Sequence, residues 1–333
     1  MSQKNAILIS DPGADSRFAQ QQSIVGSGIK SAMAVPLFDQ EQVLGILYAD
    51  TTNPLHRYTE DFLRITATFG NILAAKINNQ NLLKERQAKE VLEAELKVAS
   101  QIQNQLLPPR LLEIEGYSLS AFQAQCKAVG GDLYDVAELN NGCILLLLAD
   151  VSGKGMGAAL LMSNVLAAFR ILYCAQDFNL LEVTSRVSKE LLRVSRSEDF
   201  ATLFACQLCP KTHRLSYINA GHNPPLMVRR DGNVEQLEAS GIPIGAFDIS
   251  DWEVSSLEFG LGDFLFMFTD GVSEATNTKG EMYEDDRLEH FLINSRHKSP
   301  DELTESVLDE INSFMGGAPQ SDDITMMILR RDR

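Results

Sequence analysis

The stretch LLLLADVSGKGMGAALLMS, residues 145–163, joins an apolar run to an acid, a glycine-rich turn and a helical sequence. The apolar run predicts a buried strand that ends at Asp150, and the alanines and leucines after the turn predict a helix. Glycine-rich turns between a strand and a helix commonly bind phosphate through backbone N–H groups. Asp150 would repel a phosphate there unless a cation lay between them. The stretch therefore indicates either a nucleotide loop or a metal site.

The nucleotide alternative rests on residues 153–158, which fit the pattern G-x-G-x-x-A of dinucleotide-binding proteins. Asp177 lies about twenty residues further on, where those proteins carry the acid that binds ribose. However, Asp177 does not end a predicted strand, and Asp150 would face the pyrophosphate. A P-loop is excluded because Leu148 stands at the position of its first glycine. A nucleotide-binding oxidoreductase is therefore a remote alternative.

A predicted hairpin supplies a second acid. Asn141-Gly142 predicts a two-residue turn between strands 132–138 and 143–149. This turn would pair Asp132 with Val151 and would place Asp132 beside Asp150 at the open end of the hairpin. Two carboxylates that close repel each other unless a cation is shared or one is protonated.

Acids also stand at the ends of two other predicted strands. Asp270 follows strand 263–268, and Asp322 and Asp323 precede strand 324–329. Oxygen ligands without His or Cys favour Mg²⁺ or Mn²⁺ over zinc. If the strand ends converge, the acids suit two ions about 3.5–4 Å apart, a spacing used to activate water for phosphoryl transfer.

Composition limits the class of partner and the compartment. The chain has 333 residues and a formal net charge of −16, which argues against nucleic acid or an anionic membrane as the main partner. We expect no apolar stretch to reach the ~18 residues of a membrane span, and the N-terminus lacks the apolar core of a signal peptide. Five scattered cysteines favour reduced thiols in a cytoplasmic protein. Cys206 and Cys209 should face opposite sides of a predicted strand, which argues against a shared metal.

Three regions are predicted along the chain. Residues 1–78 read as a small α/β segment with strands at 31–37 and 42–50 and a helix at 58–77. Residues 79–108 predict a helical linker that ends before two prolines, and residues 109–333 predict an α+β domain. The remaining predicted elements of that domain are strands 201–208, 214–219 and 225–229 and helices 156–174 and 179–195.

The two N-terminal helical segments carry apolar rows. The helix at 58–77 has an apolar face through Phe62, Ile65, Phe69, Ile72 and Leu73. In the linker, an a/d-like seam steps by 4, 3, 4 and 3 residues through Leu92, Leu96, Ala99, Gln103 and Leu106. This seam favours a dimerising helix that carries a signal over a solvated connector. We predict that linker pairing shifts the helix at 156–174 and so changes metal binding.

Six motifs occur in an order that resembles a known family. They are VGGDLYDV, LADVSGKGMGAALLMS, INAGHNPPL, GIPIG, FTDGVSEA and SDDITMMIL. In this order they resemble the SpoIIE-like branch of metal-dependent Ser/Thr protein phosphatases, the protein phosphatase 2C superfamily, over residues 110–333. Residues 13–78, notably DSRFAQQQSIVGSGIKSAMAVPL, resemble the C-terminal half of a GAF sensor domain. This resemblance implies a partial GAF-like segment before the linker.

The resemblance implies an α-β-β-α sandwich with two Mn²⁺ or Mg²⁺ ions at the ends of its sheets. Asp150 would bridge both ions and the backbone carbonyl of Val151 would assist one. Asp132 would hold one ion, while Asp270 and Asp322 would hold the other. The family hydrolyses phosphoserine or phosphothreonine with metal-activated water and without a covalent phospho-enzyme.

The resemblance also implies a class of partner. The substrate would be a phosphorylated anti-anti-sigma-type antagonist protein in bacterial partner-switching or stress signalling. Lys154 either contacts the substrate phosphate or is an exposed turn lysine, and His222 is more typical of a tight loop than of a general acid. A non-catalytic sensor or scaffold of the same fold is the alternative function.

Overall fold

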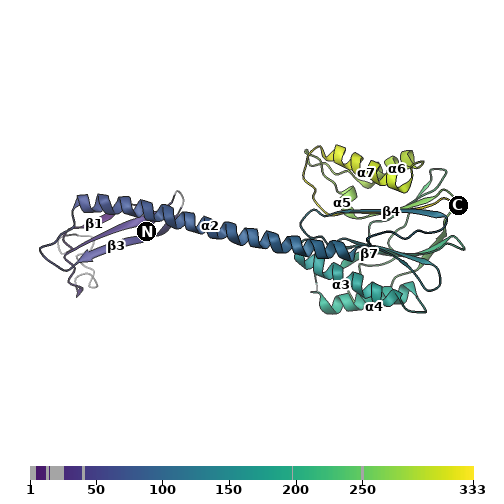
Figure 1. Ribbon diagram of the computed structural model, residues 1–333, viewed down its shortest axis with the longest axis horizontal. Helices are drawn as coiled ribbons and strands as arrows, with labels where there is room; N and C mark the ends of the chain where they lie inside the picture. Colours follow the sequence, from purple (N-terminus) through teal and green to yellow (C-terminus); the bar gives the residue numbers. More distant parts are fainter. Residues whose placement is uncertain (1–4, 13–14, 16–25, 40–41, 197, 249–250) are drawn as a thin grey trace. The chain divides into compact units, whose positions relative to one another are not determined.

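The computed structural model describes residues 5–12, 15, 26–39, 42–196, 198–248 and 251–333. The chain divides into two compact units, Met1–Ala94 and Glu95–Arg333. Helix α2 (Glu60–Leu106) runs without interruption through this division (Figure 1). One helix therefore contains both the predicted helix at 58–77 and the predicted linker, and it ends two residues before Pro108.

The first unit is a small antiparallel sheet with helix α2. The strand order is β1-β2-β3, for β1 (Ile7–Ile9), β2 (Ser31–Phe38) and β3 (Val43–Thr51). Helix α2 packs closely on β2 at Gly70, where an added Cβ would lie 2.9 Å from Val35. Residues 16–25 of the GAF-like stretch lie outside the described residues.

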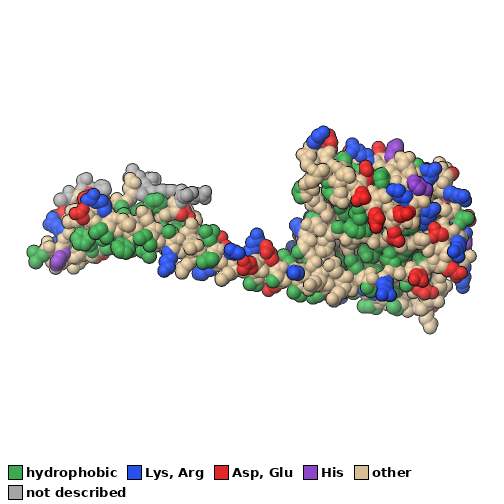
Figure 2. Space-filling view, turned by 45° about the horizontal axis from the view of Figure 1, so that its top comes forward, with side chains coloured by type: hydrophobic (Ala, Val, Ile, Leu, Met, Phe, Trp, Pro, Cys, Tyr) green, Lys and Arg blue, Asp and Glu red, His purple; other side chains and the backbone are tan. Residues whose placement is uncertain are grey.

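The apolar row on the first part of α2 does not pack into this unit. The side chains of Phe62, Ile65, Phe69 and Ile72 are 54–60% exposed, whereas Ala74 is buried. Hydrophobic side chains form a band over the first unit in the space-filling view (Figure 2). The helix therefore uses its small residues to approach the sheet and leaves its larger apolar residues outside.

The second unit contains two five-stranded sheets in which every paired strand is antiparallel. The first sheet has the order β10-β9-β12-β13-β4, with β10 (Val234–Gln236), β9 (Leu226–Val228), β12 (Phe264–Phe268), β13 (Ile324–Arg331) and β4 (Tyr117–Ala124). The second has the order β11-β8-β7-β6-β5, with β11 (Ser255–Glu258), β8 (Arg214–Ala220), β7 (Ala201–Cys209), β6 (Ile144–Val151) and β5 (Leu133–Glu138).

Helices cover the outer face of each sheet. Helices α3 (Met156–Tyr173) and α4 (Leu180–Val194) pack on the second sheet, and α6 (Asp285–Ser295) and α7 (Pro300–Met315) pack on the first (Figure 1). A third apolar cluster, including Leu146, Phe204 and Met327, fills the space between the sheets. The predicted α-β-β-α sandwich is confirmed.

Helices α6 and α7 were not predicted from the sequence, although local sequence signals mark both ends of α7. Ser299 and Glu302 form a capping box at its start, and Pro300 occupies the first turn. Gly316 ends the helix with a left-handed φ of 58°. These residues fix both ends of a helix whose apolar side is buried against the first sheet.

Helix α3 corrects the expectation that no apolar stretch reaches the length of a membrane span. Among the residues that the structure describes, this one helix is long and apolar enough for a span by length and composition. Its buried side chains include Met162, Val165 and Phe169, which belong to the core under the second sheet. Core helices of this kind satisfy the same criterion.

The hairpin between β5 and β6 differs by one residue from its predicted register. Leu133 pairs with Ala149, so Asp132 stands opposite Asp150 and not opposite Val151. The Leu139 amide donates to the Cys143 carbonyl, which leaves a three-residue loop that ends at Gly142 with a φ of 74°. A glycine at this left-handed position favours the longer turn. The correction brings the two acids closer together.

The expectation of reduced thiols is also wrong for two cysteines. Cys143 and Cys209 form a disulfide between the ends of β6 and β7. The pairing of Ile144 with Leu208 places them directly opposite each other, and no spacing in the sequence reveals this cross-strand contact. Cys206 is buried between the sheets while Cys209 packs on the α3 side, so the prediction that they face opposite sides is confirmed.

Candidate active site

The predicted acids lie at one end of the sandwich. Asp132 precedes β5 and Asp150 lies near the end of β6. Asp270 begins the short helix α5 (Asp270–Ser273) after β12, and Asp322 lies two residues before β13. Because β12 and β13 are antiparallel neighbours, the end of one meets the start of the other. The fold therefore brings acids from both sheets together.

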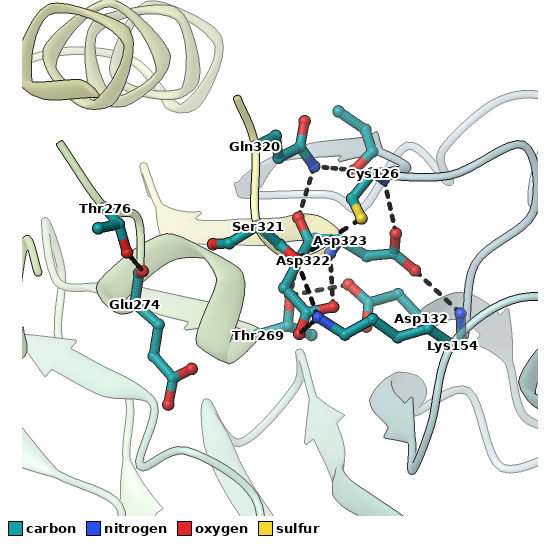
Figure 3. A network of polar contacts seen from close by, with 12 residues as sticks. Cys126, Asp132, Lys154, Thr269, Glu274, Thr276, Gln320, Ser321, Asp322 and Asp323 are labelled. Carbon is teal, nitrogen blue, oxygen red and sulfur yellow. Dashed lines mark hydrogen bonds and ion pairs between the residues drawn. The ribbon is translucent and has the colours of Figure 1, made fainter. Parts of the chain in front are cut away.

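Asp132 is almost fully buried and two threonine hydroxyls hold it. Its Oδ2 accepts a hydrogen bond from Thr269 Oγ1 at 2.8 Å (Figure 3) and another from Thr325 Oγ1. The Thr325 amide donates to Thr269 Oγ1 at 3.0 Å, which ties the two threonines together. Burial raises the pKa of Asp132 well above its usual range, and the charge of Asp150 adds to the rise. The threonines fix a carboxylate that is costly to ionise without a cation.

Asp150 and Asp270 are electrostatically coupled to the same cluster. Burial raises the pKa of Asp150 to about 7, and the charges of Asp270 and Asp322 add to the rise. Burial raises the pKa of Asp270 to about 6, with further contributions from Asp322 and Glu274. A nearby positive charge stabilises the ionised form of carboxyl groups in this environment.

The neighbours Asp322 and Asp323 have different surroundings. Asp323 is buried, and its carboxylate accepts hydrogen bonds from the amides of Cys126 and Gly131 at 2.7 and 2.9 Å. Asp322 is more exposed, and its Oδ2 lies 2.6 Å from Lys154 Nζ. Asp323 therefore ties the segment before β5 to the start of β13, while Asp322 pairs with Lys154 (Figure 3).

Lys154 is exposed and reaches the acid cluster from its solvent side. Its Nζ donates to the carbonyl of Ser321 at 2.8 Å and pairs with Asp322. The hydrogen bond to Asp322 raises the pKa of Lys154. Its ammonium group supplies the positive charge for Asp322 in this structure.

Two glycines allow the backbone before Asp132 to approach the site. A Cβ at Gly131 would lie 2.7 Å from the carbonyl oxygen of Val151, and one at Gly130 would lie 2.1 Å from Asp323 Oδ2. Gln103 of α2 holds the same segment, because its amide donates to the Gly130 carbonyl at 2.6 Å and accepts from the Gly130 amide at 3.1 Å. The linker helix thus contacts the residues that position Asp132.

His222 is a structural residue. Its Nε2 donates to the Phe268 carbonyl at 3.0 Å, so its Nδ1 accepts from Thr202 Oγ1 at 2.8 Å. Burial lowers the pKa of His222 to about 4. A neutral imidazole with both nitrogens engaged joins β7 to the end of β12.

Asp135, also near the predicted ligands, is buried and paired with Arg170 of α3 at 2.9 Å.

Several of these residues were missed by the sequence analysis. Thr269 directly precedes Asp270 and Thr325 follows Asp323 by two residues, and this proximity is the only sequence signal they carry. Gln103 was included only as part of an apolar seam. Glu274, an acid near the site, is exposed and acts on Asp270 through its charge.

The types of donor atom in the cluster fit divalent metal ions. The acids provide oxygen atoms only, and Gly131 leaves the Val151 carbonyl accessible to the cluster. These features suit Mg²⁺ or Mn²⁺. In the described part of the chain, no group of three or more His, Cys, Asp or Glu side chains is already arranged to hold an ion. The donor atoms therefore match these ions in chemical type, whereas their positions in this structure do not form a complete ligand set.

Comparison with known proteins identifies the family. The model of Stage II sporulation protein E (SpoIIE) matches residues 140–332, more than half of the chain. The chain belongs to the SpoIIE family. The GAF domain model matches residues 1–77. Both family resemblances predicted from the sequence motifs are therefore confirmed.

Individual relatives agree with this assignment. Protein IcfG from Synechocystis sp. is 27% identical to the SpoIIE-family chain over 283 residues, which cover 76% of this chain and 44% of IcfG. Phosphoserine phosphatase RsbU from Bacillus subtilis is 26% identical over 249 residues, 74% of this chain and 72% of RsbU. The chain thus spans less than half the length of IcfG.

A solved structure supports the fold. The SiaA-PP2C domain of Pseudomonas aeruginosa superimposes with a TM-score of 0.63 at 20% identity, covering 73% of this chain and 98% of that domain. At this identity the likeness shows the fold alone.

The raised pKa of Asp150 predicts a pH-dependent stability without metal. A folded-state pKa of about 7, above the usual 3.8, contributes stability that is full below about pH 4 and is lost as pH rises through 7. Asp150→Asn removes this dependence. In EDTA we expect the variant to gain roughly 1–3 kcal/mol over wild type at pH 8 and to be close to wild type at pH 4. Fluorescence of Trp252, the single tryptophan, follows urea unfolding of the second unit. The prediction would be contradicted if the free energies of unfolding of Asp150→Asn and wild type differed by the same amount at both pH values.

Proposed function

We propose that the second unit is a metal-dependent protein-serine/threonine phosphatase. The observation that carries this proposal is the convergence of Asp132, Asp150, Asp270 and Asp322 at one end of a PP2C-type sandwich, with raised pKa values at three of them. Carboxyl groups whose pKa values are raised by burial and by one another's charge are stabilised in their ionised form by bound cations. The name of the relative RsbU, a phosphoserine phosphatase, supports the class of reaction.

The residues of the chain have distinct roles in this proposal. Asp150 would contact two Mn²⁺ or Mg²⁺ ions, with Asp132 and the Val151 carbonyl on one side and Asp270 and Asp322 on the other. When bound, such ions lower the pKa of a coordinated water and neutralise phosphate charge. The two threonines keep Asp132 oriented, since both donate to its Oδ2.

The substrate we propose is a phosphoserine- or phosphothreonine-bearing antagonist protein of a bacterial partner-switching pathway, in the cytoplasm. The direct test is phosphate release by the full chain from a serine-phosphorylated anti-anti-sigma factor, with Mn²⁺ and with EDTA. We expect turnover only with Mn²⁺, and none from a phosphotyrosine peptide. Absence of turnover while Mn²⁺ still binds would favour the alternative, a non-catalytic sensor or scaffold of the same fold.

Lys154 is proposed to compete with the ion held by Asp322 and then to contact the substrate phosphate. Lys154→Gln removes the ammonium 2.6 Å from Asp322 Oδ2. We expect the dissociation constant for Mn²⁺ to fall several-fold by calorimetry, and KM for the phosphoprotein to rise with little change in kcat. Lys211→Gln, in an exposed turn, is the matched control. Unchanged Mn²⁺ affinity in Lys154→Gln would exclude the competition.

A homodimer through α2 is also proposed. The exposed residues Phe62, Ile65, Phe69 and Ile72 repeat at spacings of three and four, as in a coiled-coil seam. The later part of the predicted seam is occupied within the second unit, where Gln103 donates to the Gly130 carbonyl and Leu106 packs against the core on the α3 side. Light scattering should give a dimer for wild type and a monomer for Phe69→Glu, and a wild-type monomer at high concentration would refute the proposal.

Gln103 is proposed to transmit the state of the linker to Asp132. Gln103→Ala removes both hydrogen bonds to Gly130. The buried backbone amide and carbonyl of Gly130 then lack the side chain of Gln103 as a partner. We expect a loss of about 1–3 kcal/mol in the stability of the second unit and a several-fold weaker affinity for Mn²⁺. Gln105→Ala, exposed on the same helix, should change neither quantity. Equal Mn²⁺ affinity in the two variants would show that the linker acts elsewhere, for example through α3 as the sequence analysis predicts.

A further inference from the structure

A basic cavity lies at the end of the sandwich opposite the acid cluster. Its volume is about 520 Å³, and its lining includes Arg230, Arg296, Arg330, Arg331 and His297. Strand β13 starts two residues after Asp322 and ends at Arg331. Its eight residues therefore separate the acid cluster from the basic cavity by about 25 Å. The cavity is therefore a site of its own.

The charge of this cavity is opposite to that of the protein. The chain carries 45 acidic and 29 basic residues, yet four arginines and one histidine line the cavity with a single acid, Asp332. Among the described residues, no carboxylate lies within 4.0 Å of the guanidinium nitrogens of Arg230 or Arg296, although the Arg230 backbone amide donates to Asp263 at 2.9 Å. The Nε atom of Arg330 is buried without a hydrogen-bond partner, and Asp332 lies 3.6 Å from it.

Backbone carbonyls hold the arginines in place. Arg296 Nη1 donates to the Ile293 carbonyl at 2.8 Å and Arg331 Nη1 donates to the Phe259 carbonyl at 2.7 Å. Arg330 Nη1 donates to the Lys298 carbonyl. A carbonyl orients a guanidinium group but leaves its full positive charge available. The cavity is thus organised for a ligand that brings several negative charges.

We infer that this cavity binds a small anion with a diphosphate group. Guanidinium groups bind phosphate oxygens in bidentate pairs, so several converging arginines suit a ligand with two phosphates. The volume lies in the range of small-molecule sites. Leu261 is the one large apolar residue in the lining, which disfavours an apolar ligand. Four segments meet here: the β9–β10 turn, the β11–β12 turn, the loop after α6 and the end of β13.

Calorimetric titration of the full chain with inorganic pyrophosphate in EDTA tests this inference. We expect one binding event for wild type and for Asp150→Asn, because the acid cluster takes no part. Arg230→Gln combined with Arg296→Gln should weaken binding at least tenfold. The charge-matched control combines Arg186→Gln with Arg193→Gln, two exposed arginines outside the cavity, and should bind like wild type.

Three results would overturn the inference. They are the absence of binding at about 1 mM pyrophosphate, equal losses in the test and control variants, and binding of orthophosphate or of an oligoglutamate peptide as tightly as pyrophosphate. Unfolding curves from Trp252 fluorescence ensure that both double variants are folded before they are compared. Binding should also weaken as salt is added, because the contacts are ionic.

Discussion

Asp150→Asn is expected to lower kcat/KM for phosphate release from a phosphoserine protein by at least about 10³-fold, or about 4 kcal/mol of transition-state stabilisation. The reason is the position of Asp150, opposite Asp132 and coupled to the charges of Asp270 and Asp322. Replacing one carboxylate oxygen by an amide keeps the shape of the side chain but removes the negative charge that both ions would share. The loss of activity therefore arises from lost metal binding and not from a change in the fold.

Asp177→Asn is the control for this variant. Asp177 is exposed and lies outside the cluster, and it is the acid that a dinucleotide-binding protein would use for ribose. Its replacement should leave phosphate release unchanged. Steady-state assays with Mn²⁺ at matched protein concentrations give kcat/KM for Asp150→Asn and for Asp177→Asn. Retention of more than about a tenth of wild-type activity in Asp150→Asn would contradict the proposed role.

Gly271→Ala is expected to cost at least about 2–3 kcal/mol of stability in the second unit and to abolish activity. A Cβ on Gly271 would lie 2.0 Å from the Asp323 carbonyl oxygen and 2.8 Å from its carbonyl carbon. Because these atoms belong to the backbone at the start of β13, no side-chain rotation relieves the overlap. Either α5 or the segment with Asp322 must move, and both carry proposed metal ligands.

Gly157→Ala provides the matched substitution. An added Cβ there meets nothing within 4 Å, and the residue lies in α3, where alanine is the better helix former. We expect a neutral or slightly stabilising effect in urea unfolding followed by Trp252 fluorescence. Equal stability of the two alanine variants would show that the close approach of Gly271 to β13 is not required.

The sequence predicted those parts of the fold that depend on local pattern. Strand β6 was expected at 143–149 and is observed at Ile144–Val151, and helix α3 was expected at 156–174 and is observed at Met156–Tyr173. The acids were found because each stands where an apolar run begins or ends. Their convergence required the family resemblance, since no local signal gives the order of strands in a sheet.

The missed features depend on contacts between distant residues. The bonds from Thr269 and Thr325 to Asp132 span 137 and 193 residues, and those from Gln103 to Gly130 span 27. The disulfide joins Cys143 to a residue 66 positions away. The error in the hairpin register was local, because a three-residue loop and a two-residue loop share the same Asn-Gly signal.

The central claim is that the four carboxylates act together as a binding site for divalent metal ions. Calorimetric titration of the full chain with Mn²⁺ at pH 7.5, beside Asp150→Asn and Asp177→Asn, tests it most directly. We predict that wild type and Asp177→Asn bind Mn²⁺ with equal affinity and that Asp150→Asn loses this binding. Absence of Mn²⁺ binding to wild type up to about 5 mM, or equal binding by all three proteins, would contradict the account.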